Sequence, residues 1–159
     1  MEDNSKQKQA WVTAMRLLAA SPKTRKEMAQ KLAEKGYPQE VILLTLAQLE
    51  KQQVIDDRAY ASNLINRYRS VQPSGVKRIA FEMKRHGISS KIQEELLEDW
   101  SEDAEFERAK DIAGRRWERL SHLTPEKRSK RVYDLLARRG FDFQICRDII
   151  RELNKDADD

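Results

Sequence analysis

The sequence has little of the material from which many other protein classes are built. Its 159 residues include one cysteine, five glycines and four prolines. The single cysteine excludes a disulfide framework within the chain and fits a reducing compartment. The few turn-forming residues argue against a β-rich fold.

Long apolar runs are also missing. The richest stretch, residues 41–49, is interrupted by Thr45 and Gln48, so no segment is long enough to span a membrane. The first seven residues lack the apolar core of a signal peptide. We therefore expect a soluble protein of the cytoplasm.

Motifs of catalysis, metal binding and cofactor binding are not recognisable. His86 and His122 have no neighbours at ligand spacing, and no glycine-rich phosphate loop or activated nucleophile stands out. The pair Asp56-Asp57 stands where a helix is expected to begin, and carboxylates there cap backbone amides and offset the helix dipole. We expect a protein that is not an enzyme and that needs neither a metal nor another cofactor.

Charge, in contrast, is abundant and nearly balanced. Charged residues make up 36% of the chain, with 31 lysines and arginines against 27 acidic residues and a net charge of +4, whereas aromatic residues make up only 7%. This composition fits small helical modules with wide solvated faces better than one large core. The mild basic excess favours an acidic partner, either nucleic acid or an acidic protein surface.

A helical pattern recurs three times around Gly36, Gly87 and Gly140. An apolar pair lies eight and four positions before each glycine, and a second apolar stripe follows it. Four positions before the glycines stand Leu32, Met83 and Leu136, and thirteen positions after them stand Leu49, Trp100 and Leu153. This spacing predicts a helix, a left-handed C-cap and another helix.

With one further helix in front of each pair, the pattern predicts an all-α fold of three tandem three-helix repeats and about nine helices. We place the repeats at residues 8–53, 54–101 and 102–154, between flexible polar tails at residues 1–7 and 155–159. A repeat of about 50 residues is marginally stable alone, so we expect the repeats to pack against their neighbours as an elongated array.

Local patterns in the first repeat support these boundaries. Trp11, Met15 and Leu18 have the spacing of one helix face. Thr24 and Glu27 have the spacing of a capping box, in which each side chain bonds to the backbone N–H group of the other residue.

Basic residues form a ladder on the middle helix of the second and third repeats. The pairs that form it are Lys77-Arg78 with Lys84-Arg85, and Lys130-Arg131 with Arg138-Arg139. Residues seven or eight positions apart share a helix face, whereas in the first repeat Glu27 and Glu34 interrupt the ladder. The ladder predicts a surface for phosphates or carboxylates centred on repeats two and three, unless it is only a solvated helix face.

Residues 108–139 add to this basic character, with eleven basic and four acidic residues after an acidic run at residues 94–107. The remaining candidates for contact with the partner are Arg67, Arg115, Arg116, Lys127 and Arg128. Trp117 and Tyr68 lie among arginines, as stacking platforms for unpaired bases do, but their helical spacing favours packing in the core.

Three stretches of the chain resemble the RecX family of bacterial recombinase regulators. They are residues 24–36, residues 54–61 (VIDDRAYA) followed by Arg67, and residues 75–89 (GVKRIAFEMKRHGIS). The likeness covers about residues 10–154, and Val54 stands where the family often has a glycine. The resemblance implies a curved array of three three-helix repeats that binds the RecA filament on single-stranded DNA.

The resemblance also implies that the protein modulates, and most often inhibits, the recombinase, ATPase and co-protease activities of RecA in DNA repair, recombination and the SOS response. We expect a monomer whose partner is the RecA filament, with direct contact to single-stranded DNA left open. Two alternatives remain: a helical DNA-binding module that acts alone, and an adaptor for another protein. No recognition helix bearing Asn, Gln and Arg together supports the DNA-binding module.

Overall fold

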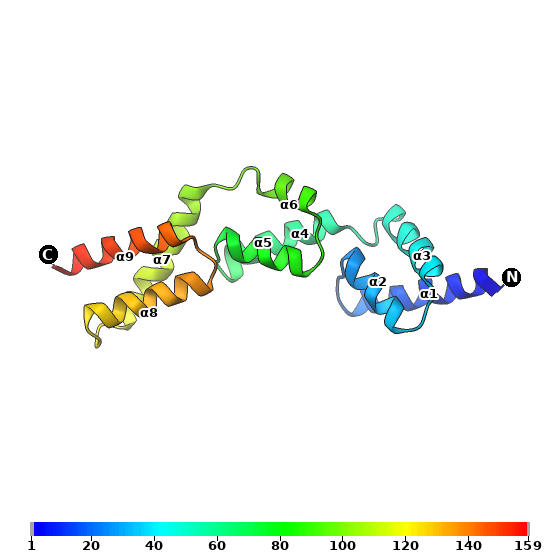
Figure 1. Ribbon diagram of the computed structural model, residues 1–159, viewed down its shortest axis with the longest axis horizontal. Helices are drawn as coiled ribbons and strands as arrows, with labels where there is room; N and C mark the ends of the chain where they lie inside the picture. The colour runs from blue at the N-terminus through cyan, green and yellow to red at the C-terminus, as the bar shows by residue number, and fades with distance from the viewer. Residues whose placement is uncertain (1, 159) are drawn as a thin grey trace. The chain divides into compact units, whose positions relative to one another are not determined.

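The computed structural model describes residues 2–158, with side chains for residues 4–156. Within this range the backbone forms nine α-helices, one short π-helical segment and no strand, which confirms the all-α prediction (Figure 1). The helices are α1 (Glu2–Ala20), α2 (Arg25–Glu34), α3 (Gln39–Lys51), α4 (Asp57–Asn66), α5 (Val76–Arg85), α6 (Ser90–Leu97), α7 (Glu102–Arg119), α8 (Pro125–Arg138) and α9 (Phe143–Asp158), with the π-helical segment η1 (Arg67–Val71) after α4.

The ends of the chain are helical as far as they are described. Residues 2–7, predicted as a tail, belong to α1, and residues 155–158 belong to α9. Residues 1 and 159 lie outside the described residues. The predicted repeats correspond to α1–α3, α4–α6 and α7–α9.

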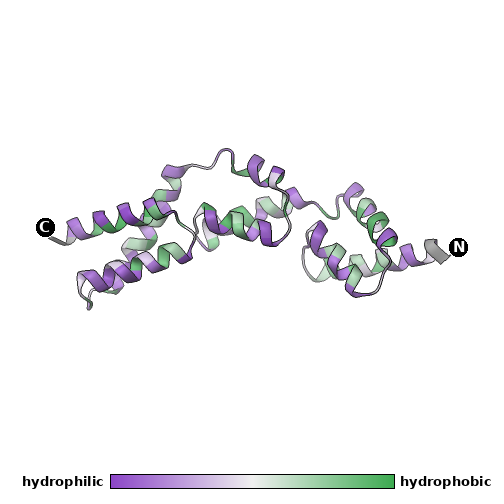
Figure 2. Cartoon of the chain, viewed as in Figure 1, coloured by the Kyte–Doolittle hydropathy of each residue, from purple (hydrophilic) through white to green (hydrophobic). Residues whose placement is uncertain are grey.

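The helices group into two compact units. Unit 1 comprises Met1–Asn63 and Met83–Glu95, and unit 2 comprises Leu64–Glu82 and Leu96–Asp159. The boundaries of the units fall inside α4, α5 and α6. Each unit contains a hydrophobic core of its own, and Figure 2 shows hydrophobic and hydrophilic residues along the same helices.

The core of unit 1 forms where α1, α2 and α3 pack together. Met28 and Leu32 of α2 are fully buried, as are Leu46 and Leu49 of α3. These four residues occupy the positions that the helical spacing assigned to the inner face, and burying each of them contributes about 1.5–3 kcal/mol.

Two alanines form the most deeply buried part of α1. Ala10 and Ala14 are fully buried, whereas Met15, which shares a helix face with Trp11 and Leu18, is 39% exposed. Trp11 and Leu18 pack at the edge of the core. The buried stripe is turned by one residue from the stripe of Trp11, Met15 and Leu18, and its alanines leave room for the neighbouring helices.

The three glycines form the same hinge in all three repeats. Their φ angles are +85° at Gly36, +78° at Gly87 and +80° at Gly140, which confirms the predicted left-handed C-caps. In each repeat, the residue after the glycine donates its backbone N–H group to the carbonyl of the residue four positions before the glycine. These bonds are Tyr37 N to Leu32 O, Ile88 N to Met83 O and Phe141 N to Leu136 O.

The capping box of α2 is also present. The backbone N–H of Glu27 donates to Thr24 Oγ1 at 3.2 Å, and the backbone N–H of Thr24 donates to Glu27 Oε2 at 3.1 Å. Thr24 Oγ1 in turn donates to the carbonyl of His86 at 2.6 Å, and His86 Nδ1 lies 2.5 Å from Glu27 Oε1. The cap therefore joins α2 to the end of α5 within unit 1.

Unit 2 depends on a close approach between the loop before α5 and the loop after α8. The backbone N–H of Gly75 donates to the carbonyl of Arg139 at 2.9 Å. A Cβ atom at Gly75 would lie 2.2 Å from the carbonyl oxygen of Gly140, and one at Gly140 would lie 2.4 Å from the backbone nitrogen of Arg78. Both glycines are therefore required by packing, and Gly140 is required by its positive φ angle as well.

The end of α6 is another difference from the prediction. The helix ends at Leu97, so Trp100 lies outside it rather than on its inner face. The Trp100 ring lies 4.9 Å from the guanidinium carbon of Arg69 and 4.9 Å from that of Arg108. Its Nε1 donates to the buried carboxylate of Glu105 at 2.6 Å. Polar and cation–π contacts outside the helix thus replace the expected apolar packing.

We expect alanine substitutions at the glycines to separate backbone strain from packing. Gly36→Ala should lower the free energy of unfolding by about 1–2 kcal/mol, because only its positive φ opposes a Cβ atom. Gly140→Ala should lower the free energy of unfolding further, because its Cβ atom would also overlap the backbone of Arg78. Gly75→Ala tests packing alone. Urea unfolding followed by circular dichroism measures all three.

Gly114 in α7 provides the matched control. A Cβ atom there meets nothing within 4 Å, so Gly114→Ala should stabilise the helix by about 0.5–1 kcal/mol. An equal loss of stability for Gly36→Ala and Gly140→Ala would contradict the role given to the Gly75–Gly140 approach.

Candidate basic interaction surface

The outer face of α5 carries the basic ladder predicted for the second repeat. Ile79 and Met83 turn inward and are fully buried. The exposed residues of the ladder are Lys77, Arg78, Lys84 and Arg85. Because the two pairs are seven residues apart on one helix, they lie on one stripe.

An exposed aromatic side chain stands between the two basic pairs. Phe81 is 61% exposed and lies four residues after Lys77 and three before Lys84. The equivalent positions, six residues before the hinge glycine, hold Gln30 in the first repeat and Asp134 in the third. Phe81 was not among the predicted contact residues, although an alignment of the three repeats on their glycines shows that this position differs.

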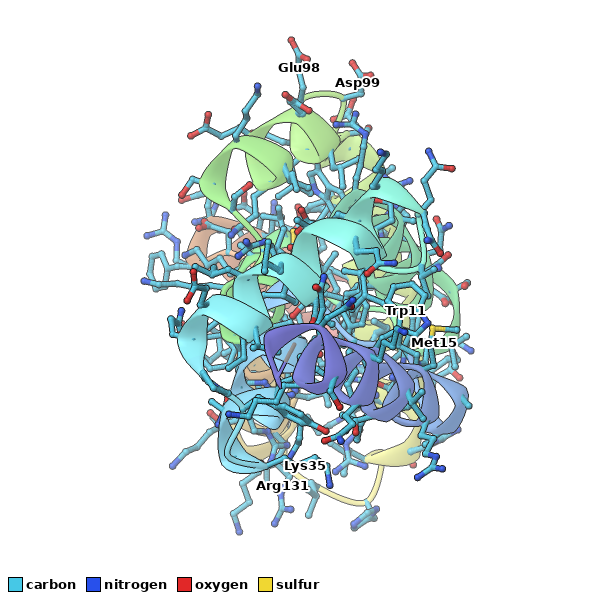
Figure 3. All side chains as sticks on the ribbon, turned by 90° about the vertical axis from the view of Figure 1, so that its right-hand side faces the viewer. Trp11, Met15, Lys35, Glu98, Asp99 and Arg131 are labelled. Atoms are coloured by element: carbon cyan, nitrogen blue, oxygen red, sulfur yellow. The ribbon has the colours of Figure 1, made fainter. Side chains whose placement is uncertain are left out.

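The outer face of α8 carries the second ladder. Val132 and Leu136 are fully buried on its inner face. The exposed basic residues of α8 are Lys127, Lys130, Arg131 and Arg138. In Figure 3 the side chain of Arg131 extends away from the ribbon. The asymmetry seen in the sequence is thus present in the structure, with basic outer faces on α5 and α8.

Acidic neighbours hold part of the α5 ladder in place. Lys77 Nζ lies 2.8 Å from Asp142 Oδ2, and Arg78 Nη2 lies 3.1 Å from Glu82 Oε1. The hydrogen bond to Asp142 raises the pKa of Lys77, and the same bond, with a smaller contribution from the Gln144 amide, lowers the pKa of Asp142. The Lys77 pair is exposed to solvent, so it adds little stability and can be exchanged for another anion.

Unit 2 contains a cavity of about 380 Å³ lined by three arginines of the predicted set. Arg78 comes from α5, and Arg138 and Arg139 come from the end of α8. The apolar part of the lining includes Val71 of η1 and Leu135 of α8. The approach of Gly75 to Gly140 brings the two helix ends together. Guanidinium groups gathered in this way are suited to phosphates and carboxylates.

The segment η1 is unusual in both backbone and exposure. Its π-helical turn spans Arg67–Val71, and turns of this kind often occur at functional sites. Tyr68 points inward and is only 8% exposed, whereas Val71 is 74% exposed beside the cavity. The turn therefore presents an apolar side chain next to the arginines.

Several arginines of the predicted set, including one that lines the cavity, have structural partners. Arg128 donates to the carbonyl of Trp117 through Nη2 at 2.7 Å and Nε at 3.2 Å, and its guanidinium carbon lies 4.1 Å from the Trp117 ring centroid. Arg139 donates to the carbonyl of Pro73 at 3.1 Å, and Arg115 pairs with Asp111. Arg67, Arg115 and Arg116 are not part of the lining of the cavity.

The two aromatic residues considered as stacking platforms are buried. Trp117 is 7% exposed and Tyr68 is 8% exposed. This confirms that their helical spacing reflects packing in the core. Their rings are not accessible to a nucleobase.

Other kinds of site can be checked within the part of the chain that the structure describes. No group of three or more His, Cys, Asp or Glu side chains there is arranged to hold a metal ion. Among residues 2–158, no helix combines the length and apolar character needed to cross a membrane. Cys146 is fully buried in the core of unit 2, and burial raises the pKa of its thiol to about 11, which suppresses its reactivity.

Arg128 should prove to be a structural member of the basic set. Arg128→Ala removes two charge-assisted hydrogen bonds and a cation–π contact, so we expect it to lower the free energy of unfolding by about 1.5–3 kcal/mol. Its exposed neighbour provides the control, since Lys127→Ala should change that free energy by less than about 0.5 kcal/mol. Urea denaturation of both variants measures the difference, and equal stabilities would contradict the assignment.

Comparison with known proteins finds the same family in all three repeats. Residues 10–49 match the family model described as "RecX, first three-helix domain". Residues 56–97 match "RecX, second three-helix domain", and residues 103–150 match "RecX, third three-helix domain". The three domains follow one another in the order of their descriptions.

Similar proteins extend over nearly the whole chain. A protein named "Regulatory protein RecX" from Chlorobium phaeobacteroides (strain BS1) is 32% identical over 146 residues, which cover 92% of this chain and 94% of the relative. Another of that name, from Mycolicibacterium smegmatis, is 29% identical over 94% of this chain and 81% of its own length.

A solved structure supports the fold. The chain described as "Crystal structure of RecX from Lactobacillus salivarius" matches with a TM-score of 0.82 and 23% identity, over 95% of this chain and 98% of that chain. Together with the three matching domains and a relative 32% identical over nearly its full length, these findings show that the chain belongs to the RecX family of regulatory proteins.

Proposed function

We propose that this protein regulates the RecA recombinase by binding the RecA filament on single-stranded DNA through the basic outer faces of α5 and α8. Membership in a family of regulatory proteins supports a regulatory role, and the resemblance described above supplies RecA as the partner. The observation that carries the choice of surface is the pair of basic ladders at corresponding positions of repeats two and three.

The first repeat uses the corresponding position differently. Glu27 stands nine residues before its hinge glycine, where repeats two and three have Arg78 and Arg131. Its carboxylate caps α2 and contacts His86 in unit 1. A position that holds a cation in two repeats therefore serves a structural contact in the other, which supports assigning the interaction to α5 and α8.

Inhibition is the direction that this mode of binding favours. A protein that contacts neighbouring RecA protomers restrains their relative movement. It favours the conformation of the filament to which it binds more tightly. Bridging in this way would block filament extension and slow ATP turnover. The protein would act as a non-enzymatic, cytoplasmic monomer.

The direct test is ATP hydrolysis by RecA on single-stranded DNA while the protein is titrated in. We expect inhibition at protein concentrations too low to coat the DNA. The variant in which Lys77, Arg78, Lys130 and Arg131 are all replaced by Glu should keep its helical content but require at least about tenfold more protein for the same inhibition, because the ladders no longer attract acidic groups.

A matched control makes the same change in net charge at residues outside the two ladders. The exposed residues Lys6, Lys8, Arg16 and Lys51, all replaced by Glu, should leave inhibition close to that of the wild type. Equal effects of the two variants would mean that overall charge matters and the ladders do not. Unchanged hydrolysis in the presence of equimolar wild-type protein would contradict the proposed function.

A DNA-binding module that acts without RecA is the second candidate, and the arginine-lined cavity favours it. It would bind DNA tightly in a salt-sensitive manner and leave RecA hydrolysis unchanged. The same titration, repeated with DNA alone, separates the two functions.

A further inference from the structure

We infer that the outer face of α5 contacts single-stranded nucleic acid, with an unpaired base stacked on Phe81 and backbone phosphates on the cations beside it. This inference rests on the proposed function, because it names the part of the filament that α5 would touch. It assigns the contact to an aromatic residue that charge patterning alone does not identify.

Phe81 is a large apolar side chain on the exposed side of α5. Its side chain is 61% exposed on a helix that buries Ile79 and Met83 completely. The other strongly exposed aromatic residue, Phe143, has ring partners: Tyr133 lies edge-on at 6.5 Å, and Arg147 lies 5.5 Å from the ring centroid.

The charges beside Phe81 suit a nucleic acid strand. Lys77 and Arg78 precede it by four and three residues, and Lys84 and Arg85 follow it by three and four. At 1.5 Å per residue, the two basic pairs are separated by roughly 10 Å along the helix, with the ring between them. A base on an aromatic face with phosphates on either side is the usual arrangement for binding single strands without sequence preference.

The arginine-lined cavity extends this surface within unit 2. Arg78, one turn before Phe81 on α5, also lines the cavity with Arg138 and Arg139. Its volume of about 380 Å³ falls within the range of small-ligand sites. Val71, 74% exposed at its edge, offers apolar surface to a sugar or a base. A strand on Phe81 therefore has a second group of cations within reach.

The aromatic centre favours a single strand over both duplex DNA and an acidic peptide. Bases in a duplex are stacked on one another, so their faces are not available to a side chain on the protein surface. An acidic peptide would use the cations but would leave the ring of Phe81 without a planar partner. A single strand uses both features, and it does so with any base, because every base has a π face.

The test is the affinity of the full-length protein for a fluorescein-labelled oligothymidylate, measured by fluorescence anisotropy without RecA. We expect Phe81→Ala to weaken binding by about 5- to 150-fold, the range for losing one stacked base. Phe81→Tyr keeps an aromatic ring and should stay within about twofold of the wild type. Leu44→Ala is the control, because Leu44 is an apolar residue of α3 that is 52% exposed.

Salt dependence separates stacking from charge. Phe81→Ala should leave the slope of log affinity against log salt unchanged, because a lost stacking contact releases no counterions. Arg138→Gln should lower the slope by about 0.7, the value for one phosphate contact on a single strand. Thermal unfolding of the Phe81 variants should match the wild type, because the side chain is exposed.

The outcomes distinguish this inference from the proposed function. Wild-type protein that fails to bind the oligonucleotide, or Phe81→Ala protein that binds it as well as the wild type, would overturn the stacking site even if RecA hydrolysis is still inhibited. Binding that depends on Phe81, together with unchanged RecA hydrolysis, would overturn the proposed function and keep the site. If Phe81→Ala abolishes binding to a labelled glutamate-rich peptide but leaves oligonucleotide binding intact, the surface is reassigned to an acidic protein.

Discussion

Unit 2 depends on the approach of two backbone segments that only glycine permits. Gly75 donates to the carbonyl of Arg139, and Gly140 lies against the backbone of Arg78. Main-chain contact at this distance fixes the start of α5 against the end of α8 more tightly than flexible side chains would. The arginine-lined cavity forms at that junction. The positions of its charged side chains therefore depend on an uncharged contact between two backbone segments.

Features that depend on neighbours in sequence were predictable. The three C-caps, the capping box at Thr24 and the burial of Trp117 follow from local hydrogen bonding and helical spacing, and the structure contains all of them. The positions that escaped prediction depend on which segments meet in space. The packing role of Gly75 was not predicted, and the helical spacing placed Trp100 on an apolar stripe. Nothing nearby in sequence reveals the loop after α8 or the arginines beside the Trp100 ring.

Charge alone did not separate structural arginines from those exposed for a partner. Arg128 holds Trp117, whereas Arg131, three residues later on α8, is exposed. The difference arises from helix geometry, because residues on the flank of the inner face reach the core and residues opposite it reach solvent. Basic residues can therefore be assigned to an interaction surface only after the partners of each side chain are known.

The hinge shared by the three repeats is made of main-chain bonds, one glycine and a buried apolar pair. None of these elements constrains the outward positions of the middle helix, which hold Gln30, Phe81 and Asp134 in successive repeats. The outer faces can therefore change by single substitutions while the framework is retained. Each repeat therefore keeps the residues that fold it apart from the residues that face a partner, so one repeat can acquire a new ligand without loss of stability in the other two.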